Sequence, residues 1–264
     1  MLPRSVKIIT WNVNSIRQRL ARAVALIERH QPDILCLQET KTTDEGFPAA
    51  EFEDLGLHVA HHGQDNGRNG VAILSRRAPV SVERGFEGDP LPEQARAITT
   101  VASGLRVVNL YVVNGKTVSA PEYAMKLRWL DAMVAWVRAF DDGTPTVIVG
   151  DFNVAPADDD VHDPSLWRGE NLASEPERER VRALLDIGMV DLLRLHHDGP
   201  GPFTWWDYRA GAFHRGWGLR IDLAIASDSL AARCTVVEVD RNERKPTAGE
   251  GKPSDHAPVI VTLS

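Results

Sequence analysis

The sequence contains few cysteines and no long hydrophobic run. Only 2 of its 264 residues are cysteine, which excludes a disulfide scaffold. Cys36 and Cys234 lie in apolar runs that predict buried free thiols. No apolar run approaches the roughly 18–20 residues that a membrane-spanning helix needs. The first residues lead directly into a strand-like run without a signal-peptide pattern, so we expect a cytoplasmic protein with no membrane partner.

The chain also has less positive than negative charge. Its formal net charge is −7 at pH 7, which argues mildly against a nucleic-acid partner. Carboxylates gathered around a metal ion would also make the net charge negative, so the charge does not exclude a nucleic-acid partner. Hydrophobic residues make up 43% and charged residues 25% of the sequence, typical of a globular protein. Without a linker or repeat, the pattern predicts one domain over residues 1–264.

Strand-like and helix-like segments alternate along the chain. Apolar runs predict strands at 6–13, 34–37, 71–75, 97–102, 105–113, 147–149, 219–226 and 259–263. Helical spacing predicts helices after residue 16, over 123–137 and from Ser174 to about Gly188. A hairpin at Ser103 and Gly104, beside strands joined through helices, predicts an α/β fold with mixed sheets. The segment 155–173 reads as a long acidic loop, and His61 and His62 as solvated loop residues.

Polar side chains stand at the ends of several predicted strands. Strand ends on one side of a sheet commonly form ligand sites in α/β proteins. Acidic groups that converge in a partly buried place repel one another unless a cation lies among them. Oxygen donors without cysteine favour Mg²⁺ or Mn²⁺ over Zn²⁺. The residues concerned are Asn12, Asn14, Glu39, Asp151, Asn153, Asp222, Asp255 and His256.

Six segments together resemble the exonuclease III family of abasic-site endonucleases, within the endonuclease/exonuclease/phosphatase superfamily. They fall in the family's order and cover nearly the whole chain. The resemblance implies a four-layer α/β sandwich, with two mixed β-sheets flanked by helices. The segments are Thr-Trp-Asn-Val-Asn-Ser-Ile-Arg at 10–17, Leu-Gln-Glu-Thr-Lys at 37–41, Asn-Gly-Val-Ala-Ile-Leu-Ser at 69–75, Gly-Asp-Phe-Asn-Val-Ala-Pro at 150–156, Gly-Leu-Arg-Ile-Asp-Leu at 218–223 and Pro-Ser-Asp-His-Ala-Pro at 253–258.

The resemblance also implies a metal site. Glu39 matches the residue that binds Mg²⁺ in the family, and Mn²⁺ is a possible substitute. Asp255 and Asn14 match positions that commonly carry an acid, so they are candidate secondary ligands. Asn14 is uncharged, which departs from that pattern.

Catalytic roles follow from the same matches. Asp151 matches the residue that orients or deprotonates the attacking water, and Asn12 matches the asparagine that positions it. Asn153 matches a residue that helps to hold phosphate or water. Asp222 and His256 match an aspartate–histidine pair, in which the carboxylate supports a cationic imidazole facing the scissile phosphate.

A third group of matches concerns the substrate. Tyr111 and Asn114 match residues that contact the phosphate, although the family's usual proline between them is Val113 here. Trp205, Leu219 and Ile221 match a small apolar pocket that admits a flipped-out sugar only when it carries no base.

Basic residues near these segments could contact the DNA backbone. Arg68 occupies a loop position where many members carry an aromatic residue or histidine, and we expect a phosphate contact there. Arg220 is a further candidate substrate ligand. Other members of such a local basic rim would be Lys116, Lys126, Arg209 and Arg215.

The resemblance implies a DNA repair enzyme that makes a Mg²⁺-dependent cut 5′ to abasic sites, with 3′→5′ exonuclease and 3′-phosphatase activity. Its partner would be double-stranded DNA with abasic sites or 3′ ends, and we expect a monomer. One alternative is an enzyme that is mainly a 3′→5′ double-strand exodeoxyribonuclease. Another is a phosphoesterase of the same fold acting on RNA, lipid head groups or inositol phosphates. A catalytically silent DNA-binding member would be expected to have lost catalytic residues that are present here.

Overall fold

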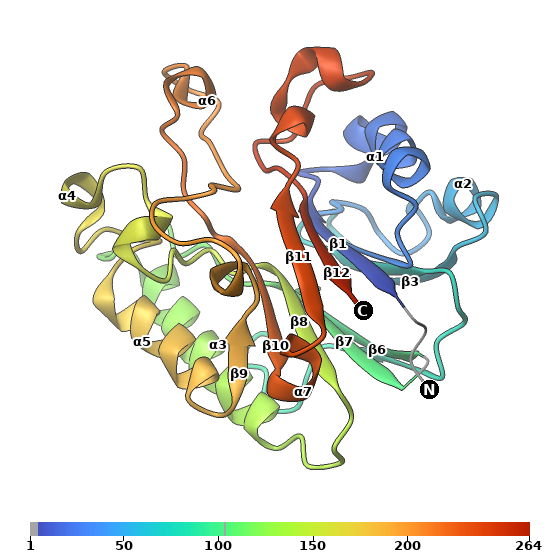
Figure 1. Ribbon diagram of the computed structural model, residues 1–264, viewed down its shortest axis with the longest axis horizontal. Coiled ribbons are helices and arrows are strands. Elements are labelled where there is room, and N and C mark those ends of the chain that lie inside the picture. The colour runs from blue at the N-terminus through green and yellow to red at the C-terminus, as the bar shows by residue number, and fades with distance from the viewer. Residues whose placement is uncertain (1–4, 103) are drawn as a thin grey trace.

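The computed structural model describes residues 5–102 and 104–264. In this part of the chain, two six-stranded sheets pack face to face, and helices lie on their outer faces (Figure 1). The predicted four-layer sandwich of two mixed sheets and flanking helices is confirmed. None of the helices in residues 5–102 and 104–264 is long and apolar enough to cross a bilayer.

The first sheet contains the strands from both ends of the chain. Its order is β11-β12-β1-β2-β4-β3. β1 and β2 are parallel, and the other neighbours are antiparallel. The strands are β1 (Val6–Asn12), β2 (Ile34–Gln38), β3 (His58–His62), β4 (Val71–Ser75), β11 (Cys234–Val239) and β12 (Val259–Leu263).

The second sheet is built from the middle of the chain, in the order β5-β6-β7-β8-β10-β9. Only the β7–β8 pair is parallel. The strands are β5 (Ser81–Arg84), β6 (Ala97–Ala102), β7 (Leu105–Tyr111), β8 (Thr146–Asp151), β9 (Met189–Asp191) and β10 (Asp222–Ser227).

Four helices cover the outer faces of the sheets. α1 (Ile16–His30) and α2 (Ala49–Glu53) pack on the first sheet, and α3 (Pro121–Arg138) and α5 (Glu175–Leu185) pack on the second (Figure 1). Apolar residues at helical spacing on α1, such as Ile16, Ala23 and Ile27, produce this packing. Shorter helices lie in connecting loops: α4 (Pro164–Trp167), α6 (Ala212–Arg215), α7 (Asp228–Ala231), η1 (Asp158–Asp160), η2 (Leu193–Leu195), η3 (Arg241–Arg244) and η4 (Pro246–Ala248).

The layer between the sheets is apolar but contains one buried amide contact. On β8, Val147 and Val149 point into this layer, whereas Ile148 points to the α3 side, as the two-residue period of a strand requires. Asn109 of β7 donates from Nδ2 to the carbonyl oxygens of Leu37 and Ala72, at 2.9 and 2.8 Å. Its Oδ1 accepts from Nε2 of Gln38 at 2.7 Å. Hydrogen bonds therefore join the two sheets near the end of β2.

Several local predictions need correction. His61 and His62 lie in β3, where His61 is buried and its Nε2 is 2.9 Å from Thr40 Oγ1. The strand predicted at 219–226 begins at Asp222, and the acidic segment 155–173 contains η1 and α4. Composition alone predicts that histidine pairs and acidic residues are exposed to solvent. Tertiary contacts override that preference here.

The predictions for the thiols and the hairpin hold in part. Cys36 is buried, whereas Cys234 on β11 is only half-buried. β6 and β7 pair antiparallel as a hairpin requires, and the turn residue Ser103 lies outside the described residues.

Candidate active site

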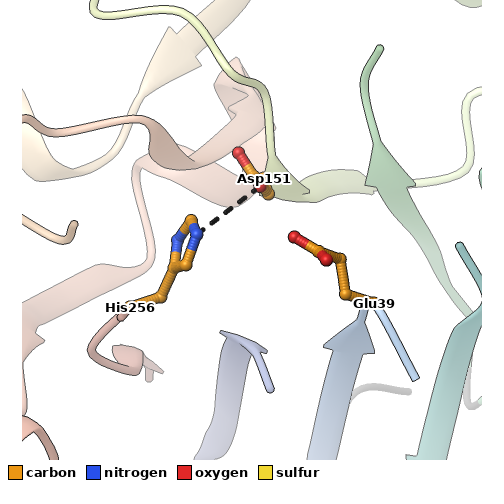
Figure 2. A group of neighbouring side chains, drawn as sticks. All are labelled: Glu39, Asp151 and His256. Carbon is orange, nitrogen blue, oxygen red and sulfur yellow. Dashed lines mark ion pairs between the residues drawn. The ribbon is translucent and has the colours of Figure 1, made fainter. Parts of the chain in front are cut away.

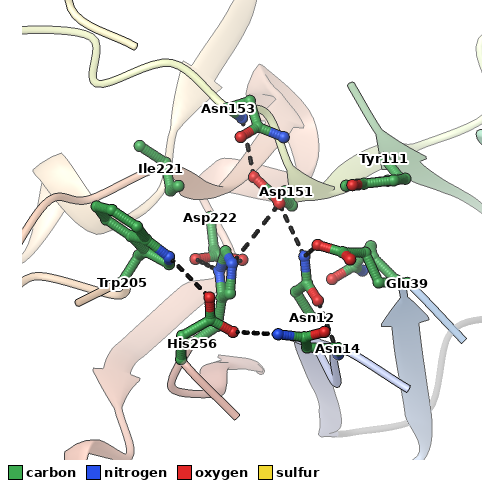
Figure 3. Close-up of polar contacts among 12 residues, drawn as sticks. Asn12, Asn14, Glu39, Tyr111, Asp151, Asn153, Trp205, Ile221, Asp222 and His256 are labelled. Carbon is green, nitrogen blue, oxygen red and sulfur yellow. Dashed lines mark hydrogen bonds and ion pairs between the residues drawn. The ribbon is translucent and has the colours of Figure 1, made fainter. Parts of the chain in front are cut away.

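Strand ends from both sheets meet at one edge of the sandwich, where the labelled polar side chains lie close together (Figure 3). Asn12 ends β1, and Glu39 directly follows the end of β2, whose last residue pairs with Asn12. In the second sheet, Tyr111 and Asp151 end adjacent parallel strands and pair with each other. Asp222 begins the antiparallel strand β10 directly opposite Asp151. The topology therefore places polar residues distant in sequence side by side.

These strand ends surround a pocket of about 160 Å³. Nine of the residues predicted from the sequence line it, together with Leu172, which was not predicted. The predicted lining residues are Glu39, Tyr111, Asn114, Asp151, Asn153, Trp205, Ile221, Asp255 and His256. Three further predicted residues, Asn12, Asn14 and Asp222, hydrogen-bond to members of this lining.

Asp151 is buried and held by two asparagines. Its Oδ1 accepts a hydrogen bond from the backbone N–H of Asn153, and its Oδ2 accepts one from Nδ2 of Asn12, at 2.9 and 2.8 Å. Burial raises the pKa of Asp151 to about 7, with Asp222 and Glu39 also raising it and His256 opposing the rise. A carboxyl group with a pKa near neutrality can both take up and release a proton at physiological pH.

His256 forms an ion pair with Asp222. Its Nδ1 lies 2.9 and 3.1 Å from the two carboxylate oxygens of Asp222, and its Nε2 lies 3.8 Å from Oδ2 of Asp151 (Figure 3). Burial lowers the pKa of His256, but Asp222 and Asp151 outweigh burial and raise it to about 10. The imidazole is therefore a cation at neutral pH, with Nδ1–H donated to Asp222 and Nε2–H directed toward Asp151.

Ligand atoms of Glu39, Asp151 and His256 lie within 4.8 Å of one another. The three side chains point toward a common space (Figure 2). A metal ligand must offer a lone pair, which an imidazolium lacks. Of these three residues, Glu39 and Asp151 therefore keep lone pairs that a metal could use, and His256 is a neighbouring charge. A hard cation would suit this oxygen donor set.

Asn14 and Asp255, the predicted secondary ligands, lie beside this group but are engaged with other residues. Asp255 accepts from Nδ2 of Asn14 at 2.9 Å and from Nε1 of Trp205 at 3.2 Å. Nζ of Lys41 lies 2.6 Å from Oδ1 of Asn14 and 2.8 Å from Oε2 of Glu39. The two oxygens already share one positive charge, which indicates that they fit a cation between them.

Tyr111 and Asn114 reach the pocket from the end of β7 and the loop after it. Burial, followed by the charges of Glu39 and Asp151, raises the pKa of Tyr111 well above its ordinary value, so its hydroxyl keeps its proton. Asn114 donates from Nδ2 to Oδ1 of Asn153 at 2.9 Å. Both side chains thus offer hydrogen-bond donors in the region of Asp151.

One wall of the pocket is apolar. Trp205, Ile221 and Leu172 contribute to it. Leu219 is fully buried and forms β-bridges with Trp205 and Val161, so it supports the wall without lining the pocket. Leu172 was missed because it lies in the segment read as an acidic loop and has no local signal of its own.

Two predicted basic contacts are wrong. Arg220 is 1% exposed, and its guanidinium pairs with Asp160 and Asp191. Lys126 is fully buried and pairs with Glu177, so it belongs to no surface rim. By contrast, Lys116, Arg209 and Arg215 are exposed, as is Arg68, whose backbone N–H bonds to Oδ1 of Asn66.

A buried carboxylate beside an imidazolium, both lining one pocket with further carboxylate oxygens, is the arrangement expected of a hydrolytic enzyme with an acid–base site. A family model described as "Endonuclease/Exonuclease/phosphatase family" matches residues 9–256. The chain belongs to this family, which confirms the resemblance read from the motifs, and the family is metal-dependent.

Individual relatives match along nearly their full length. The chain is 35% identical to exodeoxyribonuclease III of Haemophilus influenzae, covering 96% of this chain and 98% of that protein. It is similar to the structure of a 3′ phosphatase from Neisseria bound to a product DNA hairpin, with TM-score 0.94 and 40% identity over 98% of this chain and 99% of that one. It is also similar to an AP endonuclease from Archaeoglobus fulgidus, with TM-score 0.91 and 38% identity over 98% and 99%.

Proposed function

We propose that this protein is a DNA repair nuclease that cuts the backbone 5′ to abasic sites and also processes 3′ ends. The observation that carries the proposal is the placement of Asp151, Glu39 and the His256–Asp222 pair around one pocket with an apolar wall. The relatives support DNA as the substrate, because they are named as an exodeoxyribonuclease, a DNA-bound 3′ phosphatase and an AP endonuclease.

We further propose Mg²⁺, with Mn²⁺ as a substitute, as the metal held chiefly by Glu39, with Asn14 and Asp255 as secondary ligands. These residues offer only carboxylate and amide oxygens, the donors that such hard cations prefer. When bound, the ion would neutralise charge on the phosphate and its leaving oxygen.

Asp151 is the proposed acceptor of the proton from the attacking water. Hydrogen bonds from Asn12 and Asn153 reach different oxygens of its carboxylate and so fix its orientation. Its pKa of about 7 suits a general base at neutral pH. In-line attack would then yield a 3′-hydroxyl and a 5′-deoxyribose phosphate.

His256 is the proposed stabiliser of negative charge on the phosphate. Asp222 keeps it cationic and fixes the ring, and Nε2–H faces the same space as Asp151. The hydroxyl of Tyr111, which stays protonated, is a second donor for the same charge. Donors that are fixed before reaction need no reorganisation as charge develops.

The apolar wall of Trp205, Ile221 and Leu172 is the proposed contact for a sugar without a base. An extruded abasic sugar would present apolar ring atoms to these side chains, whereas a nucleotide with its base would need a larger space. We propose double-stranded DNA as the partner and a monomer as the working form.

The test is cleavage of a labelled duplex with one tetrahydrofuran site, compared with an intact recessed duplex, in Mg²⁺ and in EDTA. A single metal-dependent cut 5′ to the analogue, lost in Asp151→Asn, would support the proposal. A ladder from the 3′ end with little internal cutting would make exonuclease the main activity. No cleavage of either duplex would point instead to another phosphoester substrate.

A further inference from the structure

The buried ion pair of Lys126 and Glu177 has no role in the chemistry proposed so far. Lys126 lies on the inner face of α3 and Glu177 on α5, and both side chains are 0% exposed. Burying two charges costs several kcal/mol per ion, and such pairs often add little net stability. An apolar pair would fill this space at less cost, so packing alone does not account for the two charges.

Lys126 contacts two segments that line the active-site pocket. Besides pairing with Glu177, its Nζ donates to the carbonyl oxygen of Asn153 at 2.6 Å and to that of Asn114 at 3.1 Å. It also donates to Oδ1 of Asn171 at 3.2 Å. The ammonium group thus joins the segment after β8 to the segment after β7.

Glu177 holds a third pocket segment in the same way. Its carboxylate accepts from the backbone N–H of Leu172 at 3.1 Å and from that of Ser174 at 3.0 Å. The hydroxyl of Ser174 also donates to it. Leu172 is one of the three side chains of the apolar wall.

The segments held by this pair have backbone shapes that need support. Asn153 and Leu172 have φ angles of +51° and +78°, which cost non-glycine residues of order 1–3 kcal/mol. Gly115 has φ +88°, and a Cβ there would lie 2.8 Å from Oδ1 of Asn171 and 3.0 Å from Cδ of Lys126. The close approach of Lys126 therefore depends on a glycine at 115.

We infer that Lys126, paired with Glu177, is a positioning residue for the active site. It fixes the carbonyl of Asn153, and through that residue the hydrogen bonds that Asn153 makes to Asp151 and accepts from Asn114. It touches neither substrate nor metal. The inference rests on the proposed nuclease function for its kinetic consequence, and on geometry alone for its structural consequence.

The test compares Lys126→Met with the double variant Lys126→Met/Glu177→Gln. Lys126→Met leaves the Glu177 carboxylate buried without its partner and should lower both stability and kcat. The double variant removes both charges, so thermal stability should recover toward wild type. The bonds to the Asn153 and Asn114 carbonyls stay absent, so kcat on the tetrahydrofuran duplex should remain roughly 10- to 100-fold low, with KM little changed.

Arg180→Met is the matched control. Arg180 of α5 pairs with Asp131 of α3 at 3.0 Å, bridging the same two helices on their exposed side without reaching the pocket. This variant should keep wild-type kcat. A double variant with wild-type kcat would overturn the inference, and so would an equal loss of kcat in Arg180→Met.

Amide hydrogen exchange separates this inference from the proposed function. In Lys126→Met and in the double variant, the amides of residues 112–116 and 151–155 should exchange faster, and in Arg180→Met they should not. Unchanged exchange in the double variant would refute the positioning role even for an active nuclease. Faster exchange in the two variants, together with a wild-type protein that cleaves no DNA, would retain the positioning role and refute the nuclease function.

Discussion

Replacing Asp222 by asparagine should make catalysis depend on pH in a way that wild type does not. In the native protein, burial opposes the charge of His256, while Asp222 and Asp151 raise its pKa to about 10. Without the Asp222 carboxylate, we expect the pKa of His256 to fall toward its ordinary value of 6.5. The raised pKa keeps the imidazolium present from pH 6 to 9 in wild type, and the variant loses it as pH rises through the lower value.

The size of the effect follows from the two pKa values. At pH 8, wild type keeps about 99% of His256 protonated, whereas a group with pKa 6.5 keeps about 3%. If catalysis requires the imidazolium, the ratio of wild-type to variant kcat should grow by about 25-fold between pH 6 and 8, and by about tenfold more at pH 9. Any loss of ring orientation adds a factor that does not change with pH.

The assay is single-turnover cleavage of the tetrahydrofuran duplex at saturating Mg²⁺ between pH 6 and 9. The ratio of the two rates is fitted with the titrations of both His256 and Asp151, because Asp222 also raises the pKa of Asp151. Asp142→Asn is the control, because Asp142 is exposed and pairs with Arg106 at the opposite end of the second sheet. A wild-type to Asp222→Asn ratio that stays constant with pH would refute the reasoning.

Three further outcomes are expected. Arg220→Met should lower the free energy of unfolding by about 3–5 kcal/mol, because it removes the ion-pair partner of Asp191 and leaves Asp160 paired with Arg194 alone. Denaturant unfolding measures this, and an unchanged stability with weaker DNA binding would instead make Arg220 a substrate ligand. EDTA should stop cleavage while circular dichroism shows the fold intact, and cleavage that continues in EDTA would contradict a metal role for Glu39. Burial raises the pKa of the Cys36 thiol, so Ellman's reagent should modify half-buried Cys234 first, and equal rates at both thiols would contradict the burial difference.

The strand-end motifs made much of the site predictable. Asn12, Glu39 and Asp151 each follow an apolar strand that is recognisable by composition, and parallel neighbours end at the same edge of a sheet. The position of each residue at the end of an apolar run was therefore enough to place it correctly relative to its strand. The pairing of Asp222 with Asp151 across β8 and β10 required the sheet order, which periodicity does not give.

Lys126 and Arg220 were misplaced because their partners are distant in sequence. Glu177 lies 51 residues after Lys126, and Asp160 lies 60 residues before Arg220. A local signal existed for Lys126, since it is three residues after Tyr123 and four before Leu130, on the buried face of α3. Because long basic side chains are usually exposed, Lys126 was predicted at the surface despite its position on the buried face of the helix.

The amide contact between the sheets has a consequence for how this fold can be altered. All strands of the second sheet lie between residues 81 and 227, while strands from both ends of the chain form the first sheet. The catalytic residues are divided between the two sheets. The distances among them therefore depend on how the sheets pack in the layer between them, where Asn109 bonds to the carbonyl oxygens of Leu37 and Ala72. A chimera that exchanges one sheet for that of a relative would keep every catalytic residue. Its activity would still depend on whether the side chains between the exchanged sheets hold the two sheets in the same relative position to within a fraction of an ångström.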